Sequence, residues 1–223
     1  MSIPGASNPP PRPDRPDPAA AEWAAREAAL LQRIREHGVS DRAAWGELLS
    51  HHQDRLYAVC LRMAGREAAA DLTQDAMVKV LQHLDTYDGR SQLSTWMIRI
   101  AMNVCLSWLR GQKLRRHKHF DASQTESVRG IGTAGEGREL SGSSGVKEDE
   151  RQRAVSLALQ ELPEDQRAIL VLRDVQGLEY DQVAIVLEIP SGTVKSRLFR
   201  ARLALRERVE ERLAAMNRDR ANG

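Results

Sequence analysis

The fold of this chain is decided by residues 162–209, LPEDQRAILVLRDVQGLEYDQVAIVLEIPSGTVKSRLFRARLALRERV. Pro163, Gly177 and the turn at Pro190 divide this stretch into segments in which apolar residues recur every three or four positions, the spacing of amphipathic helices. The pattern predicts helices over 152–161, 164–175, 179–187 and 192–212. No run of alternating apolar and polar residues indicates a strand, so this part of the chain is predicted to be all-α.

The last two of these helices are joined by a short turn, which is the arrangement of a helix-turn-helix whose second helix enters the DNA major groove. One face of the second helix is apolar on a helical wheel and is predicted to pack on the first helix. This apolar face is made by Val194, Leu198, Ala201 and Leu205. On the first helix, this apolar face is expected to pack against Tyr180, Val183, Ala184 and Leu187.

The opposite face of the second helix carries Ser196, Phe199, Arg200 and Leu203. An exposed phenylalanine can contact a thymine methyl group, and an arginine can pair with a guanine edge. Between Thr193 and Arg208 the helix has six Lys or Arg residues and one acidic residue, an excess that suits phosphates. The alternative is a basic face that is merely solvated, but that would not explain the turn, the apolar face and the charge together.

A second helical block precedes this one. Its predicted helices cover 24–36, 41–64, 68–85 and 93–116. Seven of the nine prolines lie within residues 1–18, and six of the fifteen glycines lie within 130–145, so both stretches are predicted to be disordered. The expected organisation is two small all-α domains joined by a flexible linker: a Pro-rich tail at 1–22, a domain at 23–118, the linker at 119–150, a helix-turn-helix domain at 151–214 and a C-terminal tail at 215–223.

The helix predicted over 93–116 has one apolar face and one unusual face. The predicted core face consists of Leu93, Met97, Ile100, Ala101, Val104 and Trp108. The other face carries Trp96, Arg99, Asn103, Ser107 and Arg110. Basic groups interleaved with an aromatic ring and an amide suit phosphates and unstacked bases, so this face is predicted to bind nucleic acid. For Trp96 alone, a place in the core is an equal alternative.

The helix predicted over 68–85 has a buried stripe of Leu72, Ala76, Val80 and Leu84. Its outward face consists of Asp71, Gln74, Asp75, Val78 and Gln82. A polar face with one valine is compatible with a protein contact, and helix capping is an alternative role for Asp71. No nucleophile or metal ligand accompanies the carboxylates, so they do not indicate a catalytic pair.

Composition excludes several classes of protein. The chain has 223 residues, and no apolar run is long enough to span a membrane. The N-terminus lacks the basic and apolar segments of a secretory signal, so a cytoplasmic protein is expected. Cys60 and Cys105 lie among apolar residues and are expected to be buried, reduced thiols. His51, His52, His117 and His119 lack the spacing of a metal site, so neither a metal nor any other cofactor is expected.

The run DLTQDAMVKVLQHLDTYDGRSQLSTWMIRIAMNVCLSWLR (71–110), followed by residues 162–209, resembles the extracytoplasmic-function (ECF) sigma factors of bacterial RNA polymerase, group IV of the sigma-70 superfamily. The resemblance implies a non-enzymatic transcription initiation factor with a region 2 domain that recognises and melts the −10 element and a region 4 domain that reads the −35 element. Core polymerase (its clamp helices and flap), promoter DNA and an anti-sigma factor are the implied partners. The alternative is a helix-turn-helix repressor or activator that is not a polymerase subunit.

The resemblance also implies residue roles. It places Asp71, Gln74, Asp75 and Val78 at the polymerase contact. It places Gln92, Ser94, Trp96, Arg99, Asn103 and Arg110 at the −10 element, with Gln92, Ser94 and Asn103 on the bases and the two arginines on phosphates. It places Lys195, Ser196, Arg197, Phe199 and Arg200 at the −35 element. The helical wheel, taken without the resemblance, selects Ser196, Phe199 and Arg200 as well.

Three positions depart from the family's usual pattern. Ser107 stands where an acidic residue is frequent, Gln182 stands where a glutamate is frequent, and Glu188-Ile189 replaces a commoner small or Gly-Cys turn. The predicted linker has a relaxed span of roughly 30 Å and a stretched span of about 100 Å. The two modules are therefore expected to move independently until the polymerase fixes their separation.

Overall fold

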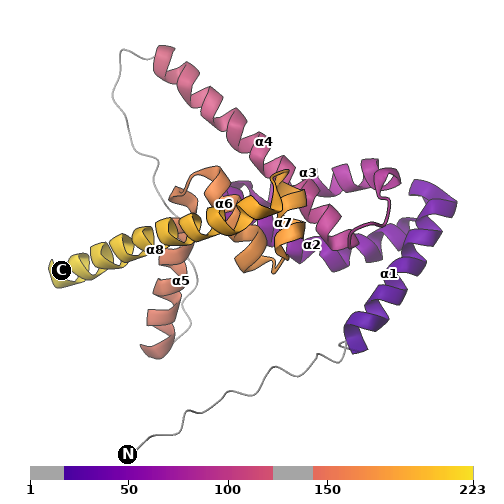
Figure 1. The fold of residues 1–223 in the computed structure, drawn as a ribbon, viewed down its shortest axis with the longest axis horizontal. Helices are drawn as coiled ribbons and strands as arrows, with labels where there is room; N and C mark the ends of the chain where they lie inside the picture. Colours follow the sequence, from indigo (N-terminus) through magenta and orange to yellow (C-terminus); the bar gives the residue numbers. More distant parts are fainter. Residues whose placement is uncertain (1–17, 123–142, 223) are drawn as a thin grey trace, which may run out of the picture. The chain divides into compact units, whose positions relative to one another are not determined.

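The computed structural model describes residues 18–122 and 143–222, and all regular structure in these ranges is helical (Figure 1). The α-helices are α1 (Pro18–His37), α2 (Arg42–Ala64), α3 (Arg66–His83), α4 (Leu93–Ala122), α5 (Ser143–Glu161), α6 (Glu164–Leu170), α7 (Tyr180–Leu187) and α8 (Ser191–Asn222). A π-helical turn, η3 (Val171–Val175), continues α6. The all-α prediction is confirmed. Most of the Pro-rich tail and of the linker predicted above lie outside the described residues.

Several helix ends differ from the predictions. α1 begins at Pro18, inside the stretch assigned to the tail, and α5 begins at Ser143, inside the stretch assigned to the linker. α8 continues to Asn222, through the segment assigned to the C-terminal tail. These segments contain few apolar residues, so the spacing of apolar side chains does not mark them as helical. Their Ala, Glu and Arg residues nonetheless have high intrinsic helix propensity.

The structure divides into two compact units, one that ends at His51 and one that begins at His52. In the first unit, Leu30 and Ile34 of α1 are buried, and two ion pairs join α1 to the residues that follow it. Arg26 pairs with Glu47 at 2.6 Å, and Arg33 pairs with Asp41 at 2.9 Å. Asp41 also accepts a hydrogen bond from the backbone N–H of Ala44 and so caps the start of α2.

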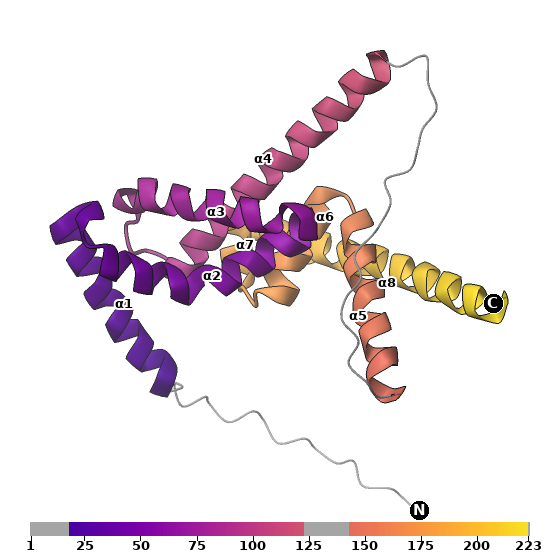
Figure 2. The ribbon, with the colours of Figure 1, turned by 180° about the vertical axis from the view of Figure 1, so that it is seen from behind.

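The second unit contains both candidate sites. α3 and α4 lie side by side in it, as Figures 1 and 2 show from opposite sides. The stripe predicted for α3, which consists of Leu72, Ala76, Val80 and Leu84, is buried, as expected. On α4, Leu93, Met97, Ala101 and Val104 are buried as predicted, but Ile100 and Trp108 are only half-buried because they line a groove rather than the core.

The two cysteines lie in the core of the second unit, Cys60 on α2 and Cys105 on α4. Both are free and fully buried, as predicted, and their side chains hydrogen-bond each other. This contact and burial raise the pKa of the Cys105 thiol. Among the C-terminal helices, α8 packs on α5, α6 and α7.

Candidate nucleic-acid interface

The helix-turn-helix is formed by α7 and α8. Val194, Leu198 and Ala201 of α8 are buried, as are Val183 and Ala184 of α7, so the predicted apolar contact is confirmed at these positions. Tyr180 differs from its prediction. The residue is 37% exposed, and its ring lies under the guanidinium of Arg173, 5.1 Å from the ring centroid, because Tyr180 starts α7 and faces the preceding turn.

The outward face of α8 presents the side chains that the wheel selected. Ser196, Phe199 and Arg200 are all exposed, and the exposed fraction of Phe199 reaches 69%. Ser196 donates a hydrogen bond to the backbone oxygen of Thr193 at 3.0 Å, which keeps its hydroxyl close to the helix. An aromatic ring this exposed, beside an arginine on a rigid helix, is a surface built to contact a partner.

The basic residues of α8 fall into two groups. Lys195 and Arg197 are exposed beside Phe199. Four arginines further along the helix instead form ion pairs, Arg202 with Asp174, Arg206 with Glu210, Arg208 with Glu211 and Arg212 with Glu161. The positive charge at the start of α8 is therefore more available to phosphates than the charge of the later turns.

The loop that precedes α4 is held by a small set of local contacts. Gly89 has φ 76°, a left-handed conformation that glycine adopts without steric cost. The Tyr87 hydroxyl donates to the backbone oxygen of Ser91 at 2.7 Å, and the Tyr87 ring lies 5.6 Å from the Trp96 ring. Gln92 is exposed, and its backbone oxygen accepts hydrogen bonds from the backbone N–H groups of Thr95 and Trp96. Tyr87 was absent from the sequence predictions, although its position beside the loop could have suggested its role.

The residues predicted on one face of α4 occupy different environments. Trp96 is half-buried between core and solvent, and Ser94 is half-buried at the start of the helix. Asn103 and Arg110 are exposed, and Arg110 donates a hydrogen bond to the Ser107 hydroxyl at 3.4 Å. An acidic residue at Ser107 would pair with Arg110, so the serine leaves the guanidinium more available.

Arg99 is engaged by another part of the second unit. Its guanidinium donates to the carboxylate of Glu188, which ends α7, at 2.7 Å. α4 and α7 pack against each other here, and the side-chain amide of Gln182 lies 3.5 Å from the Thr95 hydroxyl. The two helical modules are therefore in contact in this structure, and their independent motion in solution stays a prediction.

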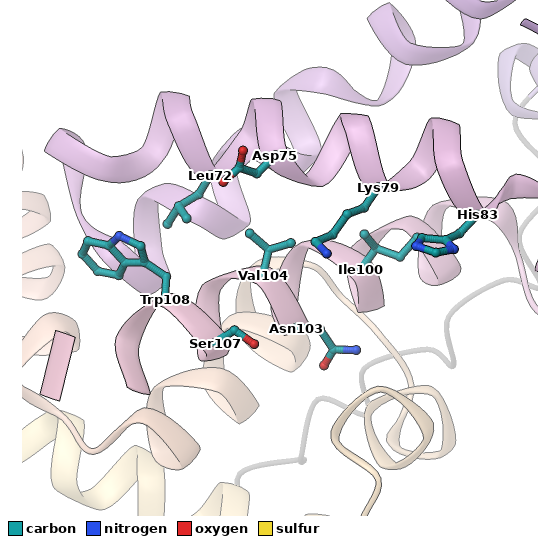
Figure 3. A pocket seen from close by; sticks show the side chains of 9 residues that line it. All are labelled: Leu72, Asp75, Lys79, His83, Ile100, Asn103, Val104, Ser107 and Trp108. Atoms are coloured by element: carbon teal, nitrogen blue, oxygen red, sulfur yellow. The ribbon is translucent and has the colours of Figure 1, made fainter. Parts of the chain in front are cut away.

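A groove of about 510 Å³ runs between α3 and α4 (Figure 3). It is lined by Leu72, Asp75, Lys79, His83, Ile100, Asn103, Val104, Ser107 and Trp108. The groove therefore brings together Asp75, a predicted polymerase contact, and Asn103, a predicted base contact. Lys79 and His83 were given no role from the sequence, although both lie in the run 71–110 that carries the family resemblance.

The outward face of α3 is exposed as predicted. Asp71, Gln74 and Asp75 are exposed, and Val78 among them is 43% exposed. α3 begins at Arg66, so Asp71 lies beyond the first turn and does not cap the helix. A carboxylate face with one exposed valine fits a protein contact.

Two of the three departures have a structural explanation. Gln182 completes a capping box at the start of α7, since its side-chain oxygen accepts from the Glu179 N–H at 2.9 Å. Glutamine and glutamate serve equally at this position. Glu188 adopts φ 55°, the left-handed conformation in which helices commonly end and which glycine adopts most easily.

Comparisons with known proteins identify both parts of the chain. Residues 48–115 match the family model for sigma-70 region 2, and residues 152–205 match the model for sigma-70 region 4. The ECF RNA polymerase sigma-E factor of Escherichia coli K12 is 30% identical over 183 residues, covering 81% of this chain and 93% of that protein. The sigma-E factor of Haemophilus influenzae is 28% identical over 188 residues, covering 82% of this chain and 94% of that protein.

Solved structures are similar as well. The sigma factor RpoE of Bartonella quintana, in complex with the anti-sigma factor NepR, is 27% identical with a TM-score of 0.55, over 74% of this chain and 96% of that one. CnrH, in complex with the cytosolic domain of CnrY, has the same fold, with 18% identity and a TM-score of 0.57 over 83% of this chain and 97% of that one. Among the described residues, no helix is both long and apolar enough to cross a membrane.

Proposed function

Because this chain belongs to the ECF RNA polymerase sigma factors, which direct transcription initiation through regions 2 and 4, we propose specific roles for its exposed residues at a bipartite promoter. The chain is a polymerase-binding initiation factor and not an enzyme. The observation that carries the proposal is the outward face of α8. There Phe199 and Arg200 stand exposed on a helix whose opposite side is buried at Val194, Leu198 and Ala201.

Region 4 contacts the −35 element through α8 in this proposal. Arg200 pairs with a guanine edge, Phe199 contacts a thymine methyl, and Ser196 lies against a neighbouring base. Lys195 and Arg197 contact the phosphates on either side. The buried apolar face of Val194, Leu198 and Ala201 supports this assignment, because it determines which side of α8 can face the DNA major groove.

Region 2 opens the −10 element in this proposal. Gln92, Ser94 and Asn103 contact bases, Trp96 stacks on one of them, and Arg99 and Arg110 contact phosphates. Extruding a base from the duplex costs a few kcal/mol, and a loop held in shape recovers that cost through stacking and hydrogen bonds. The contacts of Tyr87 with Ser91 and Trp96 support the proposal, since they hold the loop rigidly beside the aromatic ring.

The exposed α3 face supports a protein contact. Asp71, Gln74, Asp75 and Val78 form one continuous surface, which we assign to the clamp helices of core polymerase, with region 4 on the flap. An anti-sigma factor is a further proposed partner, because the similar sigma factor RpoE of Bartonella quintana is in complex with the anti-sigma factor NepR. Transcription takes place in the cytoplasm, so we assign the protein there.

Run-off transcription tests these roles. Purified core polymerase, sheared DNA from the source organism and the full chain are expected to give discrete transcripts. Arg200→Ala is expected to reduce them roughly 5- to 150-fold, the value of a specific arginine–guanine pair. Arg206→Ala is the matched control, because Arg206 is already paired with Glu210 on the same helix. Equal transcription from both variants would contradict the assignment of α8 to the promoter.

A further inference from the structure

The core of region 2 contains a pair of thiols that the proposed function does not use. Cys60 on α2 and Cys105 on α4 are both fully buried, and neither forms a disulfide. Their side chains hydrogen-bond each other, so the two sulfur atoms are in contact although the residues lie on different helices. A buried cysteine that serves only as a small apolar side chain needs no second thiol beside it. The core therefore brings together the two groups that a disulfide requires.

The two thiols differ in acidity. The Cys105 S–H donates to the sulfur of Cys60, and this hydrogen bond lowers the pKa of Cys60. The same contact, together with burial, raises the pKa of Cys105. A thiolate reacts with an oxidant and a thiol does not, so Cys60 is the residue that reacts first. A second thiol in contact with the first is the arrangement that resolves its oxidised form to a disulfide.

Burial decides which oxidants can reach this pair. Both sulfur atoms are covered by the packed helices, so a bulky reagent reaches them only when the protein unfolds. Hydrogen peroxide is uncharged and only slightly larger than water, so small fluctuations of the folded core are enough to admit it. A disulfide formed in a reducing compartment is temporary, because thiol reductants reverse it.

We propose that Cys60 and Cys105 are an oxidation site, at which hydrogen peroxide forms a reversible disulfide between α2 and α4. The Cys60 thiolate attacks one oxygen of the peroxide and the O–O bond breaks, which leaves a sulfenic acid on Cys60 and a hydroxide that takes up the proton released by the thiol. The Cys105 sulfur then attacks the Cys60 sulfur, the S–O bond breaks, and the hydroxyl group leaves as water with the Cys105 proton. The two sulfur atoms together lose two electrons, and one peroxide molecule is reduced to two water molecules.

The disulfide changes the position of α4. A covalent bond between two sulfur atoms is shorter than a hydrogen-bonded contact between two thiols, so oxidation draws α2 and α4 together. Asn103 and Val104 stand next to Cys105 in the sequence and line the groove between α3 and α4 (Figure 3). Oxidation therefore disturbs the surface that contacts the −10 element and lowers transcription. This effect, unlike the disulfide itself, rests on the proposed function of region 2.

The test uses the full chain, which is treated with a small excess of hydrogen peroxide while folded and is then separated from it. Mass spectrometry is expected to show the loss of two hydrogen atoms, and digestion without reductant to yield linked peptides that contain Cys60 and Cys105. The melting temperature is expected to rise by roughly 4–16 °C, because the bond closes a long loop, and dithiothreitol is expected to reverse the rise. Cys105→Ala is the matched variant, in which the reaction stops at a sulfenic acid that dimedone labels.

Two outcomes would overturn the oxidation site. One is a folded chain whose thiols stay reduced, or become sulfinic acids separately, without linked peptides. The other is a rate of disulfide formation that increases with urea below the unfolding transition in parallel with alkylation by iodoacetamide. That result would show that peroxide reacts only with unfolded molecules.

Run-off transcription with core polymerase measures the effect on α4. The oxidised chain is expected to give at least about twofold fewer transcripts than the reduced chain, and dithiothreitol is expected to restore them. Cys60→Ala, treated with peroxide in the same way, is the control and is expected to transcribe as before treatment. Equal transcription from the oxidised and reduced chains would overturn the effect on α4. Failure of the proposed function would appear separately, as a reduced chain that gives no transcripts.

Discussion

Replacement of Arg167 by methionine tests how the two regions of this sigma factor are joined. Only 7% of the surface of Arg167 is exposed, and its guanidinium donates to the backbone oxygens of Met63, Gln160 and Leu162, the last at 3.0 Å. Burial lowers the pKa of this guanidinium, and nearby Glu164 acts in the opposite direction. Methionine retains much of the length of the side chain but donates no hydrogen bond.

The expected loss of stability follows from these contacts. A buried carbonyl left without its donor costs about 1–3 kcal/mol. Three carbonyls lose a donor, but the variant also avoids the cost of burying a charge, which offsets part of the loss. We expect a net loss of about 2–4 kcal/mol, which lowers the melting temperature by roughly 4–16 °C in a chain of this size.

Thermal unfolding followed by circular dichroism measures this loss. The matched control is Arg173→Met, because Arg173 lies in the π-helical turn that continues α6 and donates to one carbonyl, that of Leu178, at 2.7 Å. Arg167→Met is expected to lower the melting temperature clearly more than the control does. If the two variants have the same melting temperature, the hydrogen bonds from Arg167 to Met63, Gln160 and Leu162 do not contribute the stability assigned to them, and the reasoning is refuted.

Three further predictions concern the thiols, the first unit and the capping box. The thiols of Cys60 and Cys105 are expected to react with iodoacetamide only when the protein unfolds, because both are buried and the pKa of Cys105 is raised. Rapid alkylation of the folded protein at neutral pH would contradict this prediction. The pKa of Asp41 is lowered in the folded chain by the Ala44 N–H and by Arg33, so its stabilising effect is present above the ordinary carboxyl pKa and is lost as the pH falls through the lowered value. The helical signal of α1 and α2 is therefore expected to fall more on acidification in the unmodified chain than in Asp41→Asn. Equal pH dependence of the two proteins would contradict the stabilising role of the ionised Asp41 side chain. Gln182→Ala is expected to destabilise region 4 by about 1 kcal/mol because it removes the capping box at the start of α7, whereas Gln182→Glu retains it. Urea denaturation measures the difference, and equal midpoints for the two variants would count against the capping role of Gln182.

The periodic parts of the fold could be predicted from the sequence. The stripe of Leu72, Ala76, Val80 and Leu84 and the seam of Val194, Leu198 and Ala201 are buried as expected, because helical spacing alone decides which side chains share a face. The exposed face of α8 follows from the same geometry. Trp108 shows the limit of this reasoning, since it lies on the predicted face yet borders the groove beside α3.

The contacts between the two regions could not be predicted in this way. Arg99 and Glu188 are 89 positions apart, and Arg55 and Gln176 are 121 positions apart. Each of these residues is polar and stands on a helix or at the end of one, where a solvated side chain is the ordinary expectation. Only the folded arrangement shows that they pair. The unusual Glu188 was recognised as a departure in the sequence, but its partner was not.

The central claim, that this chain opens promoter DNA as a polymerase subunit, is tested most directly by permanganate footprinting on a promoter mapped by run-off transcription. Permanganate oxidises thymines that are unpaired. With core polymerase and the chain together, we predict reactive thymines at the −10 element, and weaker reactivity there when Asn103→Ala replaces the unmodified chain. Reactivity that is equally strong with core polymerase alone, or complexes that remain fully double-stranded although the chain and polymerase are bound, would contradict the account.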